Sequence, residues 1–403
     1  MTPAGTDTPR PRPARTTTRS PRDALTAAGV FVAALLLAGC TRAPETPSAG
    51  PGGPASDPAP AAPVRLVLMA MEDYVDDGIL RQFEKETGVA VEHVIYADPE
   101  EVRSRLRSQP GSADLLIIDS FTIKLLRDLR LLCPLQKKAL TNLGNVDPRH
   151  QGLSFDPTDD FCLPYHWGTT LLAYRKDLVP DPGRSWRLLW NPALKGRVMM
   201  LHDSFEPMAV AMMLHHINPQ APREADYILA SDMMLEHLET MQARYRTDDQ
   251  IKDALVEGTV SAAMCYSGDA AVAAAENPNI DFFIPEEGAM MWVDCLAICR
   301  DTQNEALAHQ FLNFYLRPEI AARNASAINY APTNRAAEPL IAKSLKNDPR
   351  LYPPPEVLRT LQHVPNLDGI HETWAHRYWH RLRSRFIAKR EEEAAPRPAL
   401  STP

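Results

Sequence analysis

One aspartate interrupts an apolar stretch in the last third of the chain. Residues 290–299 read MMWVDCLAIC, and Asp294 is the only charged residue among them. In a strand, side chains alternate between two faces, so Trp292 and Asp294 share one face, and both faces are apolar. An ionised carboxylate in such a covered strand costs several kcal/mol without a positive or hydrogen-bonding partner. Either Asp294 binds a ligand together with Trp292, or it is a satisfied structural carboxylate.

A second pair of acids stands at the start of a predicted helix. Asp203 and Glu206 form a D-x-x-E pattern between a predicted strand at 196–203 and a predicted helix at 204–217. In this position an aspartate caps the helix, and a glutamate is stabilised by the positive end of the helix. The pattern alone favours this structural role, although one residue can both cap a helix and bind a ligand.

From residue 64 the chain alternates between predicted strands and helices. The strands are 64–70, 89–97 and 114–119, and the amphipathic helices that follow them are 76–88, 98–111 and 121–130. This order predicts an α/β fold with a parallel sheet between helices, in which ligands lie beyond the carboxyl ends of the strands. The residues at two of these ends are Met71, Glu72, Asp73, Tyr74, Asp119, Ser120 and Phe121.

A second series of strands and helices follows. We predict a strand at 169–176, a strand–turn–helix unit at 259–275, helices over 304–325 divided at Pro318, and a last helix at 373–390. That helix carries Trp374, Tyr378, Leu382 and Phe386 at four-residue spacing, with basic residues between them. We expect it to dock on the protein as a closing helix, and a helix on a membrane surface is the alternative.

The N-terminus is typical of a secretory signal. Residues 1–24 carry five arginines, and the apolar run that follows ends in Leu37-Ala38-Gly39-Cys40. The run is too short to span a bilayer as a mature helix, which predicts a cleaved signal peptide over residues 1–39. The last four residues resemble a bacterial lipobox, so we expect lipid on Cys40 to anchor the protein in the cell envelope. An ordinary signal peptide is the alternative.

The rest of the chain divides into a tether, a folded region and a tail. Residues 40–63 are rich in Pro, Ala and Gly and predict a flexible tether, and residues 390–403 predict a disordered tail. About 325 residues lie between them, more than one compact core usually holds, so we expect two lobes. Removal of residues 1–39 changes the net charge from −8 to about −11, which disfavours nucleic acid and suits a cationic partner.

Cysteines and short motifs exclude several kinds of site. Five cysteines remain after Cys40, so at least one thiol stays free, and Cys133 and Cys162 flank one loop region where they can pair. No cysteine or histidine cluster has zinc spacing, and the sequence has no G-x-S-x-G, Gly-rich phosphate loop or H-E-x-x-H motif. We therefore expect neither a metal site nor an enzyme.

Several longer stretches resemble one protein family. They include GILRQFEKETGVAV, FDPTDDFCLPYHWGTTLLAYRKDLV, SWRLLWNPALKGRVMML, EEGAMMWVDCLAI and INYAPTN. The chain from about residue 64 to 388 resembles the periplasmic spermidine/putrescine-binding proteins, which are extracellular solute-binding proteins of ABC transporters. The resemblance implies the two-lobed type II periplasmic binding protein fold, with each lobe a mainly parallel sheet flanked by helices. It assigns residues 64–169 and 292–338 to lobe 1, and residues 170–291 and 339–389 to lobe 2.

The resemblance also implies a function. The protein would capture a putrescine- or spermidine-like cation between its lobes and deliver it to an ABC permease in the inner membrane, as a monomer without a cofactor. Such a polycation needs carboxylates for its ammonium groups and aromatic faces for cation–π contact. Another small cationic solute, ferric iron, or ligand sensing without a permease are the alternatives. By family position, the acidic ligands are Asp203, Glu206 and Asp294, and the aromatic walls are Tyr74, Trp292 and Tyr330.

The chain departs from the family pattern at several site positions. Met71 and Tyr266 stand where the family has Trp, Asp119 replaces a small hydroxyl residue, and Phe121 replaces Tyr. A Gln ligand of the family has no secure counterpart, and Pro365-Asn366 lies in its region. We expect Tyr266 and Asp119 to belong to the site, with helix capping as the alternative for Asp119. These changes keep the preference for cations but leave the particular polyamine open.

Overall fold

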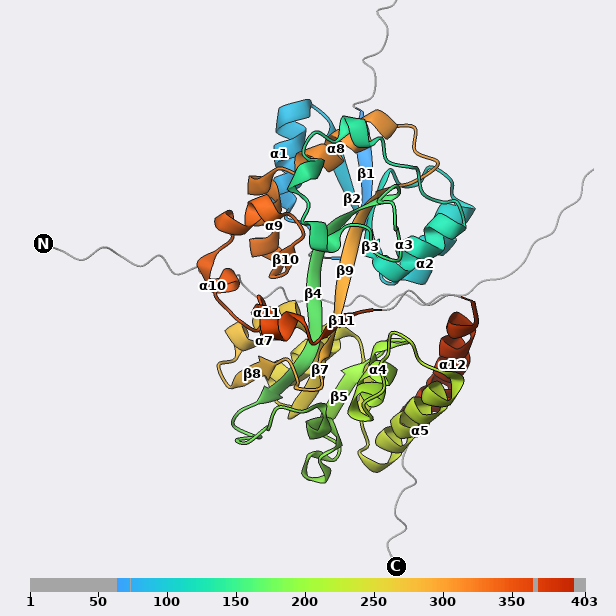
Figure 1. The fold of residues 1–403 in the computed structure, drawn as a ribbon, viewed down its shortest axis with the longest axis vertical. Helices are drawn as coiled ribbons and strands as arrows, with labels where there is room; N and C mark the ends of the chain where they lie inside the picture. Colours follow the sequence, from blue (N-terminus) through green and yellow to red (C-terminus); the bar gives the residue numbers. More distant parts are fainter. Residues whose placement is uncertain (1–63, 73, 365–368, 395–403) are drawn as a thin grey trace, which may run out of the picture. The chain divides into compact units, whose positions relative to one another are not determined.

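The structure is a computed structural model that describes residues 64–72, 74–364 and 369–394 (Figure 1). The predicted signal peptide, the lipid site at Cys40, the tether, Asp73 and Pro365-Asn366 lie outside these residues. Within them, strands and helices alternate along the chain, and the strands form one connected sheet. The predicted α/β fold is confirmed.

The first strands and helices follow the predicted order. They are β1 (Arg65–Ala70), α1 (Asp77–Thr87), β2 (Ala90–Ile95), α2 (Pro99–Ser108), β3 (Leu115–Asp119) and α3 (Ser120–Asp128). β1 lies between β2 and β3 and is parallel to both. Asp76 and Asp98 cap the starts of α1 and α2, and Gly88 ends α1 in the left-handed conformation at φ 73°. Local cap residues therefore set the helix boundaries.

Two long strands, β4 (Cys162–Arg175) and β9 (Ala289–Ile298), lie side by side and antiparallel (Figure 1). β9 is also antiparallel to β3. β4 pairs with β9 as far as Thr169, and from Thr170 onward it pairs with β7 (Ala262–Tyr266) and β8 (Ile280–Phe283). β5 (Val198–Leu201) lies between β7 and β6 (Arg244–Arg246) and is parallel to both. The strands β2, β1 and β3 are thus parallel as predicted, as are β7, β5 and β6, whereas β4 and β9 are antiparallel to each other and to β7 and β3.

The remaining elements flank these strands. They are α4 (Glu206–Leu214), α5 (Glu224–Thr240), α6 (Asp248–Glu257), α7 (Ser267–Glu276), α8 (Glu305–Tyr315), α9 (Pro318–Ile328), β10 (Ala331–Pro332), α10 (Lys343–Lys346), α11 (Pro355–Leu358) and β11 (Leu361–His363). α9 begins at Pro318 as predicted, because proline fits the first turn of a helix but not its interior. β10 pairs with β4, and β11 pairs with β9.

Buried side chains form separate groups on the two faces of β9. Leu296 and Ile298 belong to one group, and Val293, Cys295 and Ala297 belong to the other. The predicted alternation of residues 290–299 is therefore confirmed. A further group is built from residues between 171 and 290 together with the last helix.

The suggested pairing of Cys133 with Cys162 is wrong. The cysteines of the described residues are free thiols. Cys162 is buried in the group that contains Cys295, whereas Cys133 packs against the group on the opposite face of the sheet. The sheet separates the two thiols, although both residues flank the same loop region.

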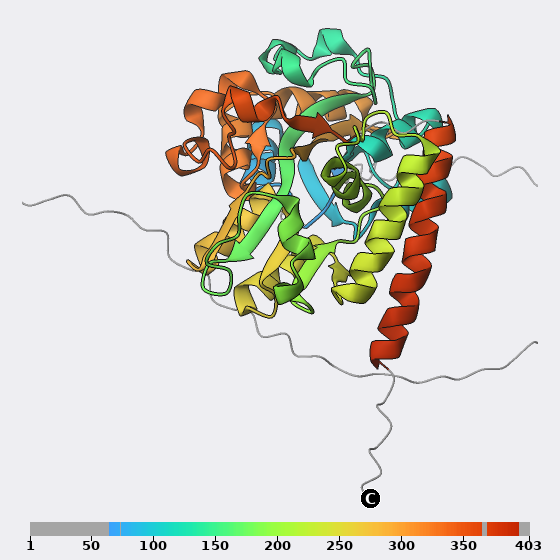
Figure 2. The same cartoon turned by 60° about the horizontal axis from the view of Figure 1, so that its bottom comes forward.

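The last helix, α12 (Gly369–Ala394), lies along α5, as Figure 2 shows. Ala375, Trp379 and Leu382 are buried in the core next to α5, so the closing helix that we predicted is confirmed. α12 also includes residues 391–394, which we had assigned to the tail. No helix of the described residues is long and apolar enough to cross a membrane. The ion pairs between α12 and α5 are Arg377–Glu224 (2.8 Å), Arg381–Asp232 (2.6 Å) and Arg385–Glu239 (3.3 Å).

The docking of α12 predicts a difference between two substitutions on the same helix. Leu382→Ala should lower the free energy of unfolding by about 2–5 kcal/mol, because Leu382 is fully buried and its truncation leaves a cavity. Arg383→Ala, at an exposed position, should change it by less than about 0.5 kcal/mol. Denaturant unfolding of both variants measures this difference. Equal stability of Leu382→Ala and the unchanged protein would contradict the docked position of α12.

Candidate functional site

Asp294 lies in a row of side chains that crosses three strands. In the strand pairing it stands opposite Asp119 of β3 and opposite His166 of β4. Asp294 is only 4% exposed, and the hydroxyl of Tyr74 donates a hydrogen bond to its Oδ2. His166 Nδ1 lies 3.7 Å from the same oxygen. The partner that we expected for this buried carboxylate is therefore a tyrosine hydroxyl.

Burial sets the protonation of this row. The pKa of Asp294 is raised to about 7 by burial, with an upward contribution from the charge of Asp119 and a downward one from the Tyr74 hydrogen bond. Burial lowers the pKa of His166 to about 3, so its contact with Asp294 is not an ion pair at neutral pH. Burial also raises the pKa of Tyr74 well above its ordinary value, so its hydroxyl stays a donor.

Asp119 is the N-cap of α3, as the structural interpretation predicted, whereas the N-cap of α4 is Phe205 and Asp203 lies two residues before it. Thr122 donates its backbone N–H to Asp119 Oδ1 at 2.8 Å and its hydroxyl to Oδ2 at 2.7 Å, at the start of α3. At the start of α4, Asp203 Oδ1 accepts from the backbone N–H groups of Phe205 at 2.8 Å and Glu206 at 2.7 Å. Burial raises the pKa of Asp119, and the charge of Asp203 raises it further. The two helix starts therefore bring their carboxylates close enough to interact.

Glu206 is another buried acid of this group. It is 5% exposed, and the Thr170 hydroxyl of β4 donates a hydrogen bond to its Oε2. Burial first and the charge of Asp203 second raise the pKa of Glu206 to about 8. In the described part of the chain, no Lys or Arg forms an ion pair with Asp119, Asp203, Glu206 or Asp294. These four residues, named the acidic cluster below, lack a cationic partner there.

Aromatic rings flank the acidic cluster. The Trp292 ring lies edge-to-face with Tyr330 at 4.9 Å and with Tyr266 at 5.6 Å between ring centroids. Two glycines make room for these rings. A Cβ at Gly168 would lie 2.3 Å from the Trp292 ring, and a Cβ at Gly268 would lie 2.5 Å from the Tyr330 ring. Close approach of the backbone therefore fixes the positions of both rings.

The eight predicted site residues are in one connected set. Tyr74 joins Asp294, Asp294 stands opposite Asp119, and Asp203 interacts with Asp119 and Glu206. Tyr266 lies close enough to Glu206 for the charge of Glu206 to raise the pKa of Tyr266. The Trp292 ring contacts the rings of both Tyr266 and Tyr330. Their role as ligand contacts stays a prediction.

The resemblance also marks Met71 and Phe121, outside this set, as departures from the family pattern. Met71 packs beside the core of Val293, and Phe121 packs against the core of residues 171–290. Gln362 stands opposite Met290 in the β11–β9 pairing, on the face of Trp292 and Asp294, and its Oε1 is buried without a hydrogen-bond partner among the described residues. Gln362 therefore lies on the same face of the sheet as the predicted site residues Trp292 and Asp294.

Two residues next to the acidic cluster escaped the sequence analysis. His166 shares one face of β4 with Gly168 and Thr170. In the sequence PYHWGTT, every second residue from His166 lies on this face, and this pattern could have identified His166 as a site residue. Asp269, in the first turn of α7, accepts a hydrogen bond from the Tyr330 hydroxyl at 3.3 Å. Burial, followed by the charge of Asp248, raises the pKa of Asp269 to about 7. In the sequence, its position three residues after the predicted site residue Tyr266 could have identified Asp269.

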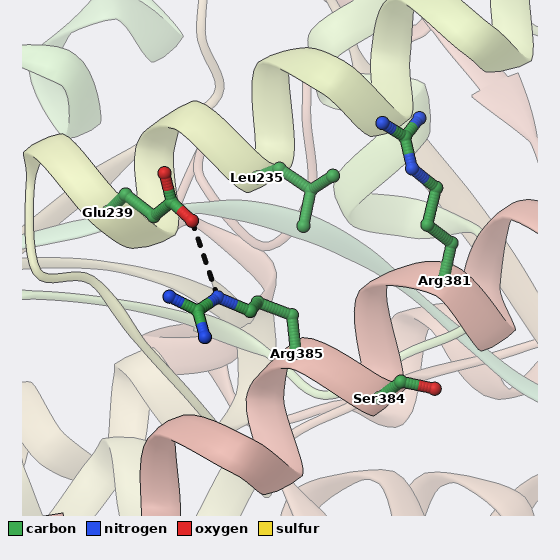
Figure 3. A pocket seen from close by; sticks show the side chains of 5 residues that line it. All are labelled: Leu235, Glu239, Arg381, Ser384 and Arg385. Carbon is green, nitrogen blue, oxygen red and sulfur yellow. Dashed lines mark hydrogen bonds and ion pairs between the residues drawn. The ribbon is translucent and has the colours of Figure 1, made fainter. Parts of the chain in front are cut away.

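Two hollows in the described part of the chain lie away from the acidic cluster. One hollow of about 400 Å³ lies between side chains of α5 and α12 (Figure 3). Across it, Arg385 donates a hydrogen bond to Glu239. Another of about 260 Å³ touches Met291 and Val293, on the face of β9 opposite Asp294. Within the described residues, no group of three or more His, Cys, Asp and Glu side chains is arranged to hold a metal ion. The candidate site is therefore identified by its converging carboxylates and rings.

Comparisons with known proteins identify the family. Residues 78–353 match the family described as bacterial extracellular solute-binding protein. The spermidine/putrescine-binding periplasmic protein of Escherichia coli K12 is 33% identical over 291 residues, which are 71% of this chain and 82% of that protein. The putrescine-binding periplasmic protein PotF of the same strain is 29% identical over 343 residues, 79% of this chain and 91% of that protein.

A solved structure supports the same conclusion. The substrate-binding protein PotD of a Streptococcus pneumoniae spermidine/putrescine ABC transporter, in complex with calcium and HEPES, is 25% identical with a TM-score of 0.72, and the match covers 81% of this chain and 99% of that one. The predicted periplasmic binding protein fold and the resemblance to spermidine/putrescine-binding proteins are confirmed. The chain belongs to the family of bacterial extracellular solute-binding proteins.

Proposed function

We propose that this protein captures a linear polyamine, of the putrescine or spermidine type, and delivers it to an ABC permease in the inner membrane. The acidic cluster carries this proposal, since it has no cationic partner among the described residues and is flanked by Trp292, Tyr266 and Tyr330. Carboxylates beside aromatic faces suit ammonium groups on an aliphatic chain. The names of the relatives, which include spermidine and putrescine, support the same ligand class, and the family is one of binding proteins.

The binding site would lie between two lobes, residues 64–169 with 292–338 and residues 170–291 with 339–389. The separate groups of buried side chains support this division, because the group of residues 171–290 differs from those around β1, β3 and the carboxyl half of β9. Lobe 1 would contribute Asp294 and Tyr74, and lobe 2 would contribute Asp203 and Glu206. Lipid on Cys40 would retain the protein at a membrane surface.

Charge couples ligand binding to closure in this proposal. Without a ligand, the repulsion within the acidic cluster is limited by protons, as the raised pKa values of Asp294 and Glu206 indicate. A bound polycation compensates the ionised carboxylates of both lobes at once and favours the closed form. The closed form would then dock on the permease.

Loss of the Asp294 charge should weaken polyamine binding. Asp294→Asn should reduce the binding free energy by about 1.5–3 kcal/mol, the range for a hydrogen bond to a charged group. Asp226→Asn is the control, because Asp226 is equally buried but pairs with Arg223 at the start of α5. Calorimetric titration with putrescine, spermidine, spermine, basic amino acids and ferric iron measures both variants and the unchanged protein. If Asp294→Asn binds polyamines as tightly as the unchanged protein, Asp294 is not a ligand-binding residue. Binding of ferric iron without binding of any amine would favour the ferric alternative.

The raised pKa values predict that affinity increases with pH. The acids must ionise to bind a cation, so their pKa values fall in the complex, and binding releases protons. Since the free pKa values are about 7 for Asp294 and about 8 for Glu206, affinity should rise through this range and level off above it. We expect putrescine to bind about tenfold or more weakly at pH 5.5 than at pH 8.5. Calorimetry in buffers of different ionisation enthalpy counts the protons, and an affinity that falls with pH would contradict this prediction.

The tight contact between Gly168 and Trp292 predicts a steric effect on binding. Gly168→Ala should displace the Trp292 ring, because its Cβ would lie 2.3 Å from ring atoms. We expect a loss of affinity of about 0.5–2 kcal/mol, the range for a cation–π contact with the ligand that the displaced ring no longer makes. Gly144→Ala is the control, since a Cβ there meets nothing within 4 Å. Tryptophan fluorescence and calorimetry of both variants test this, and an unchanged affinity of Gly168→Ala would mean that the ring position does not matter for the ligand.

A further inference from the structure

His166 is buried beside the acidic cluster without a hydrogen-bond partner. His166 is 1% exposed, and neither nitrogen of its ring has a hydrogen-bond partner among the described residues. A neutral imidazole has one N–H donor and one lone-pair acceptor, and a buried polar group without a partner costs free energy. At the buried His309, by contrast, both ring nitrogens are paired: Nε2 accepts from the backbone N–H of Gln136, and Nδ1 meets the carbonyl of Glu305.

The ring of His166 contacts residues that we assign to the ligand-binding site. Its ring stacks on Tyr330 at 5.6 Å with 20° between the planes, and it meets the rings of Tyr74 at 4.8 Å and Trp292 at 6.1 Å edge-to-face. Its Nδ1 lies 3.7 Å from Asp294 Oδ2. The imidazole is therefore enclosed by three of the rings that we assign to the ligand and by the carboxylate between them.

Packing alone does not account for an imidazole at this position. An apolar ring would make the same stacking contacts with Tyr330 and Trp292 and would bury no unpaired polar atom. A structural ion pair with Asp294 also fails as an explanation, because burial keeps the imidazole neutral at ordinary pH. What a neutral imidazole adds to a site of carboxylates and rings is one uncharged hydrogen-bond acceptor.

We propose that His166 is a ligand-binding residue, in which one ring nitrogen accepts a hydrogen bond from the ammonium group that Asp294 holds. This inference rests on the proposed function and adds a selection rule to it. A primary ammonium has three N–H donors, enough for Asp294 and His166 together, whereas a trimethylammonium has none. Aromatic faces and a carboxylate attract both kinds of cation. His166 therefore selects primary ammonium ends over N-methylated ones.

The test compares two ligands on two proteins by calorimetry. The ligands are putrescine and its analogue with a trimethylammonium group at each end. In His166→Phe, the ring volume stays but the acceptor is lost. Putrescine should bind roughly 10- to 100-fold more weakly to this variant, while the affinity for the quaternary analogue should change less than about threefold. His150→Phe is the matched control, since His150 is also buried with an unpaired Nδ1 but stacks on Trp167, outside the acidic cluster.

A measurement on the unchanged protein completes the test. With ¹⁵N-labelled histidine, one His166 ring nitrogen should change its chemical shift on saturation with putrescine but not with the quaternary analogue. The protein has 12 histidines. The signal of His166 is the one that is absent from the spectrum of His166→Phe or, if that variant does not fold, from the spectrum of His166→Gln. Equal loss of affinity for both ligands, no loss for either, or an unchanged nitrogen shift with putrescine would each overturn the role of His166. Failure of the unchanged protein to bind any amine would instead overturn the proposed function.

Discussion

Asp294 and Asp119 stand directly opposite each other on adjacent strands, and neither has a basic partner in the described part of the chain. Like charges in this arrangement destabilise a sheet, and burial adds to the cost of ionising either group. The protein tolerates the pair because the Tyr74 hydroxyl hydrogen-bonds one carboxylate, Thr122 hydrogen-bonds the other, and protons can neutralise them in part. A cation supplied from outside offsets the same repulsion without those protons, which is why we regard the charge arrangement as the basis of the binding function.

The backbone places this chemistry through two strands and two helix starts. Every second residue of β4 from His166 to Thr170 faces the site, with an imidazole near Asp294, a glycine under Trp292 and a hydroxyl on Glu206. The capping hydrogen bonds of α3 and α4 hold Asp119 and Asp203 at the ends of their strands. The same hydrogen bonds that define the helices therefore orient the carboxylates, so capping and ligand binding are compatible roles for these residues.

Local patterns predicted much of this arrangement. The strands and helices from β1 to α3, the break at Pro318, the two faces of β9 and the capping of α3 by Asp119 all follow from residues close in sequence. What escaped prediction depends on contacts between distant residues. The Asp269–Tyr330 hydrogen bond joins positions 61 residues apart, and that between Tyr74 and Asp294 joins positions 220 apart. The pairing of Cys133 with Cys162 failed for the same reason, because loop proximity does not reveal which face of a sheet each thiol occupies.

Asp119, which by the resemblance replaces a small hydroxyl residue, places a second carboxylate opposite Asp294. Each of its carboxylate oxygens already accepts one hydrogen bond from Thr122 at the start of α3, so its position is set by the helix and not by a ligand. Yet its charge contributes to the raised pKa of Asp294, which it faces across the sheet. A small hydroxyl at this position could cap α3 equally well but could not raise that pKa. Under the proposed function, the aspartate would make ligand binding more dependent on protons and would favour a ligand that brings two or more positive charges.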